Sequence, residues 1–586
     1  HLFVLGNDSG KDAEVAQGTS HCTAYIHNTR PNESNVPKGF TGVVTDDYSP
    51  QFEARVLGDL QGKPVAADPV DPDPAMPHYG RLQRLEDKMT GTAKMAVGAV
   101  EVAGAEVRSH FTDARPALEQ LESTSAATPM RHLAKMAEQI MHDPVLGGTT
   151  KSAALLRLVT ARGTQPGDAD GVIYRTSNPD KFAGHLKGAD LARFLALQQA
   201  NAAKPGDWAG WQSYMDRATG TVNRTGNHVE NLIDGEAAFP AQYEAIDHAK
   251  KFINLSIHTF ASDESGWEYA KHLAEAASPP RNVQVRVLYD GFGSHATDGQ
   301  PTDPRIYQYL KDHGVQLIQY KDAALDSHLS HRKILETDDG GDGLVTFCGG
   351  MNIADYHEDI WHDVFSRVTG PAAADLGSLF VQQWEGQGGH IDDAEKAACT
   401  APQAAVGDSS TRVVGHVGLA DQNMKLAYLR AIDTSEKSID IADPYFCDKD
   451  VFEHLEAAAK RGVKVRLFWP AHDNQVFSLY AAQESFPDLL KAGVEIYKYG
   501  GRPMAHTKIA VFDNRLATVG SSNLDARSLV NNDEANIWTE DPQVANDLTQ
   551  RYFEADLPTC TRLTEYHASG MEAVKNKVFS ALANQV

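Results

Sequence analysis

Cysteine is scarce in this sequence. The 586 residues contain five, and no two of them form a Cys-x-x-Cys pair: Cys22, Cys348, Cys399, Cys447 and Cys560. Such scattered spacing disfavours a structural zinc site or a dithiol redox centre. One or two disulfides remain open, so cysteine usage leaves the redox compartment undecided.

Long apolar segments are also missing. No stretch of about 18 apolar residues occurs, which argues against a membrane-spanning helix. Residues 1–12 lack the continuous apolar core of a signal peptide, and the first residue is not methionine. A processed or trimmed terminus would begin in this way. The missing signal therefore says little about the compartment. Our expectation is a soluble protein that is secreted or exported rather than resident in the cytoplasm.

Positive charge is outweighed by negative charge. The chain has 54 Lys and Arg against 79 Asp and Glu, which gives a formal net charge of −25. A field of this sign repels nucleic acid and anionic membrane surfaces at long range, so a nucleic-acid partner is disfavoured. A few lysines in a cleft can still bind an anion, because their field acts over about one Debye length.

A pattern of helices and strands occurs twice in the later part of the chain. Residues 245–260 and 431–446 each resemble the end of a helix followed by an apolar strand, and a second helix-to-strand step follows each. This predicts a duplicated α/β unit with a mostly parallel sheet and helices on both faces. The expected parts are an N-terminal region of unknown role, 1–220, largely helical after about residue 79, and two units, 221–400 and 401–586.

One short motif is present in both units. The stretch "HRKILETD" begins at His331 and "HTKIAVFD" begins at His506. In a strand, alternate side chains share a face, so the histidine and lysine of each copy point the same way. A second apolar strand follows each motif and ends in small residues and an asparagine, Asn352 or Asn523. Small residues there let a ligand approach the backbone.

The two copies together supply a set of side chains that suits a tetrahedral phosphate. One histidine can attack phosphorus, while lysine and asparagine neutralise the oxygens as charge develops. The second histidine can protonate the departing oxygen and later activate water. Two histidines with different tasks give a physical reason for two copies. The candidate residues are His331, Lys333, Asn352, His506, Lys508 and Asn523.

This doubled motif resembles that of the phospholipase D superfamily. Residues 361–384 and 520–537 resemble the segments that follow the first and second motifs in bacterial phospholipases D and cardiolipin synthases. The resemblance covers about residues 221–556, and two copies in one structural context are far more specific than one. It implies an α/β fold in which two α/β/α units pack as a pseudo-twofold pair behind a mainly helical N-terminal region.

The resemblance also implies roles for individual residues. His331 would be the nucleophile and His506 the general acid and base, although the near-symmetry of the site allows the reverse. Asp363 and Glu534 would each orient a histidine ring. The acids that close the motifs, Asp338 and Asp513, would be structural, with Asp342 as an alternative to Asp338 because its spacing to the following strand matches that of Asp513. No metal and no cofactor are implied.

The expected function is hydrolysis of a phospholipid to phosphatidic acid and the headgroup alcohol through a phosphohistidine. Transphosphatidylation would result when an alcohol replaces water. The alternatives are a cardiolipin synthase-like phosphatidyltransferase, a metal-independent phosphodiester nuclease, which the net charge disfavours, and, last, a binding protein without activity. The expected partners are a phospholipid substrate and, peripherally, a membrane surface.

Overall fold

The computed structural model describes residues 3–5, 25–27, 43–44 and 115–583, except 122, 177–178, 297–301, 321–327, 342, 419 and 472–475. The chain divides into two compact units, residues 1–94 with 298–300, and residues 95–297 with 301–586. In the first unit the described residues form three short parallel strands, β1 (Phe3–Leu5), β2 (Tyr25–His27) and β3 (Val43–Val44). The helical segment expected between 79 and 114 lies outside the described residues.

The described part of the second unit begins with a group of helices, most of which share one core. Helix α4 (Met130–His142) shows why they form: Leu133, Met136 and Ile140 recur at helical spacing, and all three are buried in that core. Most of the other helices pack around the same core, and α9 joins a different one. Their bounds are α3 (Arg115–Leu121), α5 (Gly148–Thr160), α6 (Asp168–Ile173), α7 (Pro179–Gly184), α8 (Gly188–Ala200) and α9 (Trp208–Thr219).

The rest of the second unit is organised by one sheet of fifteen strands. The strand order is β18-β14-β13-β12-β15-β16-β17-β11-β4-β10-β9-β8-β5-β6-β7. The first half of the sheet consists of β4 (Asn223–Ile233), β5 (Phe252–Ile257), β6 (Gln284–Asp290), β7 (Gln316–Tyr320), β8 (Ile334–Asp338), β9 (Leu344–Gly349) and β10 (Val364–Thr369). The second half consists of β11 (Ser409–His416), β12 (Ser438–Ala442), β13 (Lys464–Pro470), β14 (Glu495–Tyr499), β15 (Ile509–Phe512), β16 (Leu516–Gly520), β17 (Glu534–Glu540) and β18 (Cys560–Leu563).

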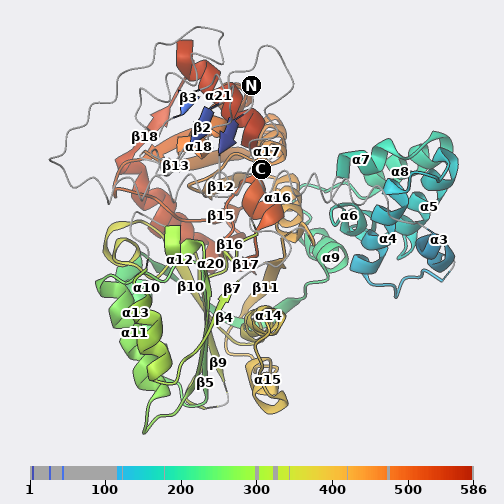
Figure 1. Ribbon diagram of the computed structural model, residues 1–586. Coiled ribbons are helices and arrows are strands. Elements are labelled where there is room, and N and C mark those ends of the chain that lie inside the picture. The colour runs from blue at the N-terminus through green and yellow to red at the C-terminus, as the bar shows by residue number, and fades with distance from the viewer. Residues whose placement is uncertain are drawn as a thin grey trace. The chain divides into compact units, whose positions relative to one another are not determined.

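The order of the strands reads the same in both directions from the centre. Outward from the antiparallel pair β4–β11, one side continues β10, β9, β8, β5, β6, β7 and the other β17, β16, β15, β12, β13, β14. The two halves are therefore related by a pseudo-twofold axis between β4 and β11, and the predicted duplication of an α/β unit is confirmed. Figure 1 shows the two halves, one mainly green and yellow and one mainly orange and red.

The expectation of a mostly parallel sheet is wrong. Among the described strands of the large sheet, parallel pairing is confined to β5–β6–β7 and β12–β13–β14. The motif strand of each half forms a tight hairpin with the next strand, β8 with β9 and β15 with β16, and such short connections join only antiparallel strands. Both halves are thus mixed sheets.

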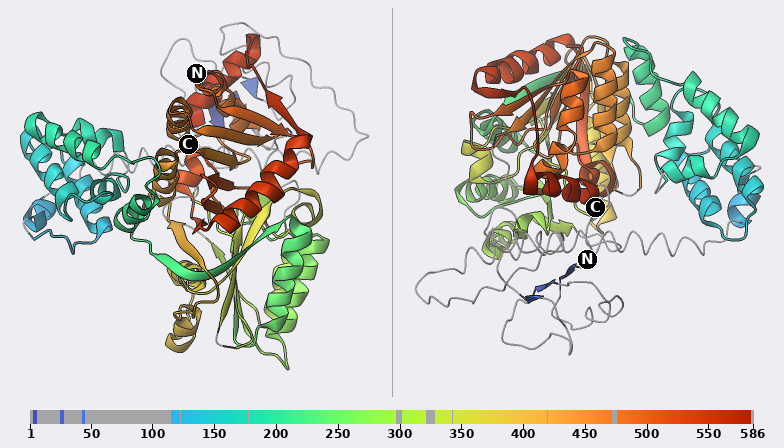
Figure 2. Two further views of the ribbon diagram at one scale, coloured as in Figure 1. Left: turned by 180° about the vertical axis from the view of Figure 1, so that it is seen from behind. Right: turned by 90° about the horizontal axis from the view of Figure 1, so that it is seen from above.

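Helices cover both faces of each half, as Figures 1 and 2 show. In the first half, α10, α11 and α13 bury their apolar residues on one face and α14 and α15 on the other. In the second half, α9 and α16–α19 cover one face and α20 the other. Among the described helices, none combines the length and apolar character needed to cross a bilayer. The bounds are α10 (Gly235–His248), α11 (Glu264–Ala277), α12 (Gly293–Ala296), α13 (Pro304–Asp312), α14 (Ala373–Gly386), α15 (Asp393–Cys399), α16 (Asn423–Thr434), α17 (Lys449–Lys460), α18 (Val476–Gln483), α19 (Phe486–Ala492), α20 (Pro542–Leu548) and α21 (Gly570–Ala583).

Candidate active site

Each histidine motif is anchored by the backbone of the opposite half. The His331 backbone N–H donates to the Asp533 carbonyl at 2.9 Å, and the His506 N–H donates to the His362 carbonyl at 2.7 Å. The residue before each histidine forms a parallel β-bridge with the same segment, Ser330 with Asp533 and Ala505 with His362. The two motifs therefore meet along the pseudo-twofold axis, where the halves join.

The histidine rings also take their carboxylate partners from the opposite half. His331 Nδ1 lies 2.9 Å from Glu534 Oε1, and His506 Nδ1 lies 2.8 Å from Asp363 Oδ2. A carboxylate in this position fixes the ring and leaves Nε2 to face the reacting group. Because each pair spans both halves, a half on its own would hold a histidine without its acid.

The glutamate side chain is longer than the aspartate side chain, and the residue that lies against each carboxylate differs accordingly. The Ser521 hydroxyl donates to Glu534 Oε2 at 2.5 Å. The equivalent residue in the first half is Gly350, where an added Cβ would lie 2.3 Å from Asp363 Oδ1. The first copy thus requires glycine for close approach, whereas the second has room for a serine that supports the longer carboxylate.

The two lysines and two asparagines complete the site. Lys333 and Lys508 are buried, and Lys508 Nζ lies 2.9 Å from His506 Nε2. Lys333 Nζ donates to the His331 carbonyl at 2.8 Å. Asn352 Oδ1 accepts from the Thr259 N–H at 3.1 Å, and Asn523 Nδ2 lies 3.4 Å from Ser528 Oγ. The structure therefore brings the six residues that the motifs singled out to the region where the halves meet.

Burial dominates the ionisation of this region. It lowers the pKa of Lys333 to about 7 and that of Lys508 to about 8, while it raises the pKa of Asp363 and of Glu534 to about 7 each. Burial, assisted by the two lysine charges, holds the pKa of His331 well below its usual value. A neutral imidazole is the form that can act as a nucleophile.

The acids that close the two motifs lie away from the histidines. Asp338 accepts hydrogen bonds from the backbone N–H groups of Lys250, Lys251 and Phe252, at the start of β5. Asp513 does the same for residues 436–438, at the start of β12. Asp338 thus occupies the position equivalent to Asp513, and Asp342 lies outside the described residues.

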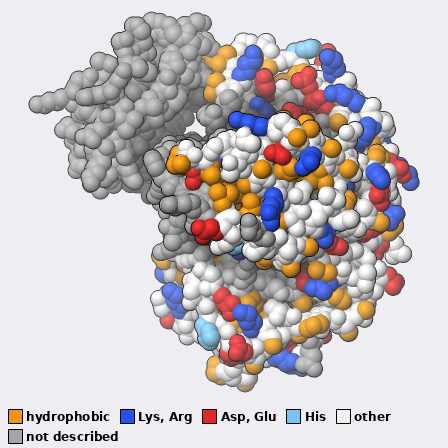
Figure 3. Space-filling model, turned by 90° about the vertical axis from the view of Figure 1, so that its right-hand side faces the viewer, with side chains coloured by type: hydrophobic (Ala, Val, Ile, Leu, Met, Phe, Trp, Pro, Cys, Tyr) orange, Lys and Arg blue, Asp and Glu red, His pale blue; other side chains and the backbone are white. Residues whose placement is uncertain are grey.

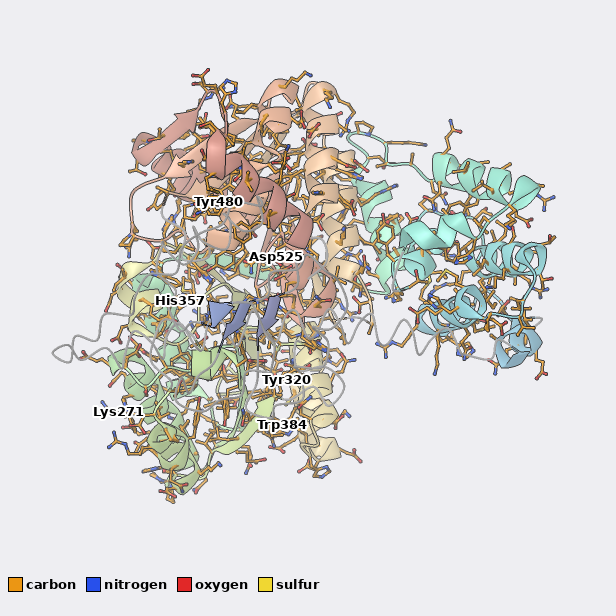
Figure 4. All side chains as sticks on the ribbon, turned by 45° about the horizontal axis from the view of Figure 1, so that its top comes forward. Lys271, Tyr320, His357, Trp384, Tyr480 and Asp525 are labelled. Atoms are coloured by element: carbon orange, nitrogen blue, oxygen red, sulfur yellow. The ribbon has the colours of Figure 1, made fainter. Side chains whose placement is uncertain are left out.

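Several residues at the site were not identified from the sequence. The His258 ring lies 4.8 Å from the His331 ring, and the His357 ring lies 5.0 Å from the His506 ring. Trp361 also lies against His506, at 5.1 Å. Figure 4 labels His357, which comes from the first half and lies where the halves meet. The sequence does place His258 directly after β5, the strand that pairs with the motif strand β8, but no spacing rule pairs it with His331.

Among the residues that the structure describes, one group of side chains could hold a metal ion. Ligand atoms of His357, Asp363 and His506 lie within 4.8 Å of one another. Lys508 Nζ, however, is 2.9 Å from His506 Nε2, and its positive charge opposes a bound cation there. The metal-independent site expected from the sequence stays a prediction.

The described surface in Figure 3 shows acidic and basic side chains interspersed with apolar ones. On the described part of that face, basic residues do not gather into a continuous patch of the kind that binds nucleic acid. This agrees with the net charge of −25.

A duplicated α/β fold with one composite site where its halves meet defines this class of protein. Comparison with known proteins shows which proteins the chain is similar to. The family model described as "Cardiolipin synthase, PLD-like domain" matches residues 243–384 and 428–557. A probable cardiolipin synthase of Bacillus subtilis (strain 168) is 29% identical over 365 residues, which cover 60% of this chain and 70% of that protein. A cardiolipin synthase of Geobacillus sp. (strain WCH70) is 32% identical over 327 residues, covering 52% of this chain and 62% of that protein.

A solved structure, phosphatidylserine synthase of Haemophilus influenzae Rd KW20, superposes with a TM-score of 0.47 and 16% identity over 61% of this chain and 94% of that one. The family match covers both motif copies. Both halves of the chain thus match a PLD-like domain, in keeping with the resemblance of the two motifs to the phospholipase D superfamily.

Proposed function

We propose that this protein is a phosphatidyltransferase that joins two phospholipids. The proposal follows the names of its relatives, which are cardiolipin synthases. Hydrolysis was the first expectation from the sequence and transfer its alternative, and the relatives favour the alternative. The observation that carries the proposal is the pair of histidines, each backed by a carboxylate of the opposite half and accompanied by a buried lysine.

Two displacements at phosphorus make up the proposed reaction. In the first, the Nε2 atom of one histidine forms a bond to phosphorus while the bond to the headgroup oxygen breaks, and the other histidine donates a proton to that oxygen. In the second, a hydroxyl oxygen of the acceptor lipid bonds to phosphorus, its proton passes to the second histidine, and the phosphorus–nitrogen bond breaks. Lys333 and Lys508 offset the negative charge in both steps.

Hydrolysis is the competing outcome of the same intermediate. The His331 side chain is 12% exposed, so water can reach this side of the site. If water takes the place of the acceptor, the products are phosphatidic acid and the free headgroup. The balance between transfer and hydrolysis then depends on how well the acceptor lipid excludes water.

The products formed from pure phosphatidylglycerol test the proposal. Transfer gives cardiolipin and glycerol in equal amounts, whereas hydrolysis gives phosphatidic acid and glycerol. Choline release from phosphatidylcholine is measured in parallel, and single-stranded DNA without metal tests the nuclease alternative. Phosphatidic acid without any cardiolipin would refute transfer. His331→Ala and His506→Ala serve as inactive controls, with thermal unfolding showing that they still fold.

A further inference from the structure

The two sides of the site are not equivalent, although the fold is nearly symmetric. Four residues after each asparagine a short π-helical turn begins, at Tyr356 in the first half and at Arg527 in the second. Tyr356 packs on Trp361 at 4.4 Å, and Trp361 in turn lies against His506. The side of the site beside His506 is thus aromatic. In the second half, the position equivalent to Tyr356 is occupied by the cation Arg527.

Arg527 lies on the side of His331. Its charge interacts most strongly with the Asp525 carboxylate, then with those of Asp290 and Glu534, and it also acts on the His331 ring. Its Nε donates to Asn532 Oδ1 at 3.4 Å. Its guanidinium carbon lies 6.0 Å from the centroid of the Phe292 ring, which follows β6 of the first half. Arg527 therefore comes from the second half but lies against Phe292 of the first half, close enough to His331 for its charge to act on that ring.

The exposure of Arg527 differs from that of the lysines. Lys333 and Lys508 are 0% and 1% exposed, whereas Arg527 is only half-buried. Burial lowers the pKa of the two lysines to about 7 and about 8, so near neutral pH the empty site holds them only partly charged. Burial lowers the pKa of Arg527 as well, but from a far higher starting value, so its guanidinium group stays protonated near neutral pH. It can donate two parallel hydrogen bonds to phosphate oxygens.

A phosphoryl group gains negative charge on its non-bridging oxygens during displacement, and a fixed cation beside it is worth more than one that must first take up a proton. We propose that Arg527 is a third phosphate-binding cation of this site and contacts a non-bridging oxygen of the reacting phosphoryl group from the side of His331. This inference deepens the proposed function but rests only on its phosphodiester chemistry, because it requires no particular acceptor.

Two probes test the role of Arg527. The first is turnover of bis(4-nitrophenyl) phosphate, a soluble diester that needs no lipid surface. The second is calorimetric binding of inorganic phosphate, which needs no turnover. Arg527→Ala should lower kcat for the soluble diester about 100-fold, the order seen when one oxyanion donor is removed. Arg527→Ala should also weaken phosphate binding at least about tenfold. In both kcat and phosphate affinity, Arg527→Lys should lie between the wild type and Arg527→Ala.

Chemical rescue separates contact with phosphate from a structural role. Guanidinium chloride at low, non-denaturing concentration should restore part of the activity of Arg527→Ala. It should not raise the activity of the wild type. The matched control is Arg515→Ala, because Arg515 is half exposed and pairs with Glu540 away from the histidines. Arg515→Ala should keep wild-type turnover and phosphate affinity.

Three results would overturn the inference. The first is unchanged phosphate binding and turnover in Arg527→Ala. The second is a loss of activity that matches a loss of thermal stability and shows no rescue. The third is a loss of transfer to phosphatidylglycerol with normal turnover of the soluble diester, which would place Arg527 at the acceptor instead. If the wild type makes no cardiolipin but the soluble diester depends on Arg527, the proposed transfer fails and the inference stands.

Discussion

His331 Nδ1 and Glu534 Oε1 lie 2.9 Å apart, although 203 residues separate them in the chain. The pseudo-equivalent pair, His506 with Asp363, spans 143 residues in the same crosswise manner. Each half of the sheet therefore supplies a histidine to one pair and a carboxylate to the other. A composite site of this kind ties activity to the correct docking of the two halves, since separating them removes both pairs at once.

Replacing the acid behind either histidine should lower activity without unfolding the protein. Glu534→Gln and Asp363→Asn keep the size of the side chain but remove the charge that orients the ring and stabilises its protonated form. We expect kcat to fall about 100-fold or more in each variant, with little change in KM. Steady-state kinetics check this, and Ser521→Ala, which removes only the hydrogen bond to Glu534, should cause a smaller loss. Wild-type kcat in Glu534→Gln would contradict the assigned role.

The dependence of kcat/KM on pH should be bell-shaped with a maximum near neutral pH. Below about pH 7 Asp363 and Glu534 become protonated, because burial raises their pKa values, and the histidines lose their charged partners. Above about pH 7 to 8 Lys333 and Lys508 lose their protons, because burial lowers their pKa values. Since kcat/KM reports the free enzyme, its alkaline limb should lie more than two pH units below that of an ordinary lysine.

Bound substrate should move the alkaline limb. The anionic phosphate stabilises both ammonium groups, so kcat, which reports the complex, should stay high to a more alkaline pH than kcat/KM. Glu534→Gln leaves Asp363 as the remaining acid of the pair, so its acid limb should be shallower. A kcat/KM that stays constant up to about pH 9 would show that neither lysine titrates as the structure indicates.

Asp338→Ala should destabilise the fold rather than the chemistry. The Asp338 carboxylate accepts backbone N–H groups at the start of β5, and its removal leaves them without that acceptor. We expect the free energy of unfolding to fall by about 3 kcal/mol, the order for buried donors that lose their partner. Urea denaturation measures this. Asp339→Ala is the matched control. Asp339 is the next residue, its side chain is exposed, and it accepts hydrogen bonds only within the turn.

Activity per folded molecule separates the two roles of the motif. Below the unfolding transition, Asp338→Ala should keep kcat within about twofold of the wild type, because its carboxylate does not contact the histidines. A large drop in kcat with unchanged stability would instead place Asp338 in the chemistry.

Metal chelation should leave activity unchanged, and added zinc should inhibit. The proposed displacement uses side chains alone, so EDTA should alter kcat by less than about twofold. His357, Asp363 and His506 offer three ligand atoms within 4.8 Å of one another, and a zinc ion that displaces Lys508 would block His506. His357→Gln should raise the zinc concentration needed for half-inhibition. Loss of activity on chelation, restored by one metal, would contradict the metal-independent mechanism.

The repeated architecture was open to prediction because its signals are local. Apolar residues alternate with polar ones along residues 252–257 and 438–442. Because a strand places alternate side chains on opposite faces, this local pattern predicts strands, and both segments are strands. The spacing of histidine and lysine in each motif likewise places both side chains on one face. The direction of pairing was predicted wrongly, because a run of apolar residues is compatible with parallel and antiparallel neighbours alike.

By itself, the sequence determined that there would be two α/β units, two copies of a histidine and lysine motif, and a charge that disfavours nucleic acid. Only the tertiary structure decided that His331 is paired with Glu534 and His506 with Asp363, and that Arg527 and His258 flank one side alone. The physical reason is distance along the chain. Contacts between residues more than a hundred positions apart leave no periodicity in the sequence, and arise only when two folded surfaces bury their apolar faces against each other.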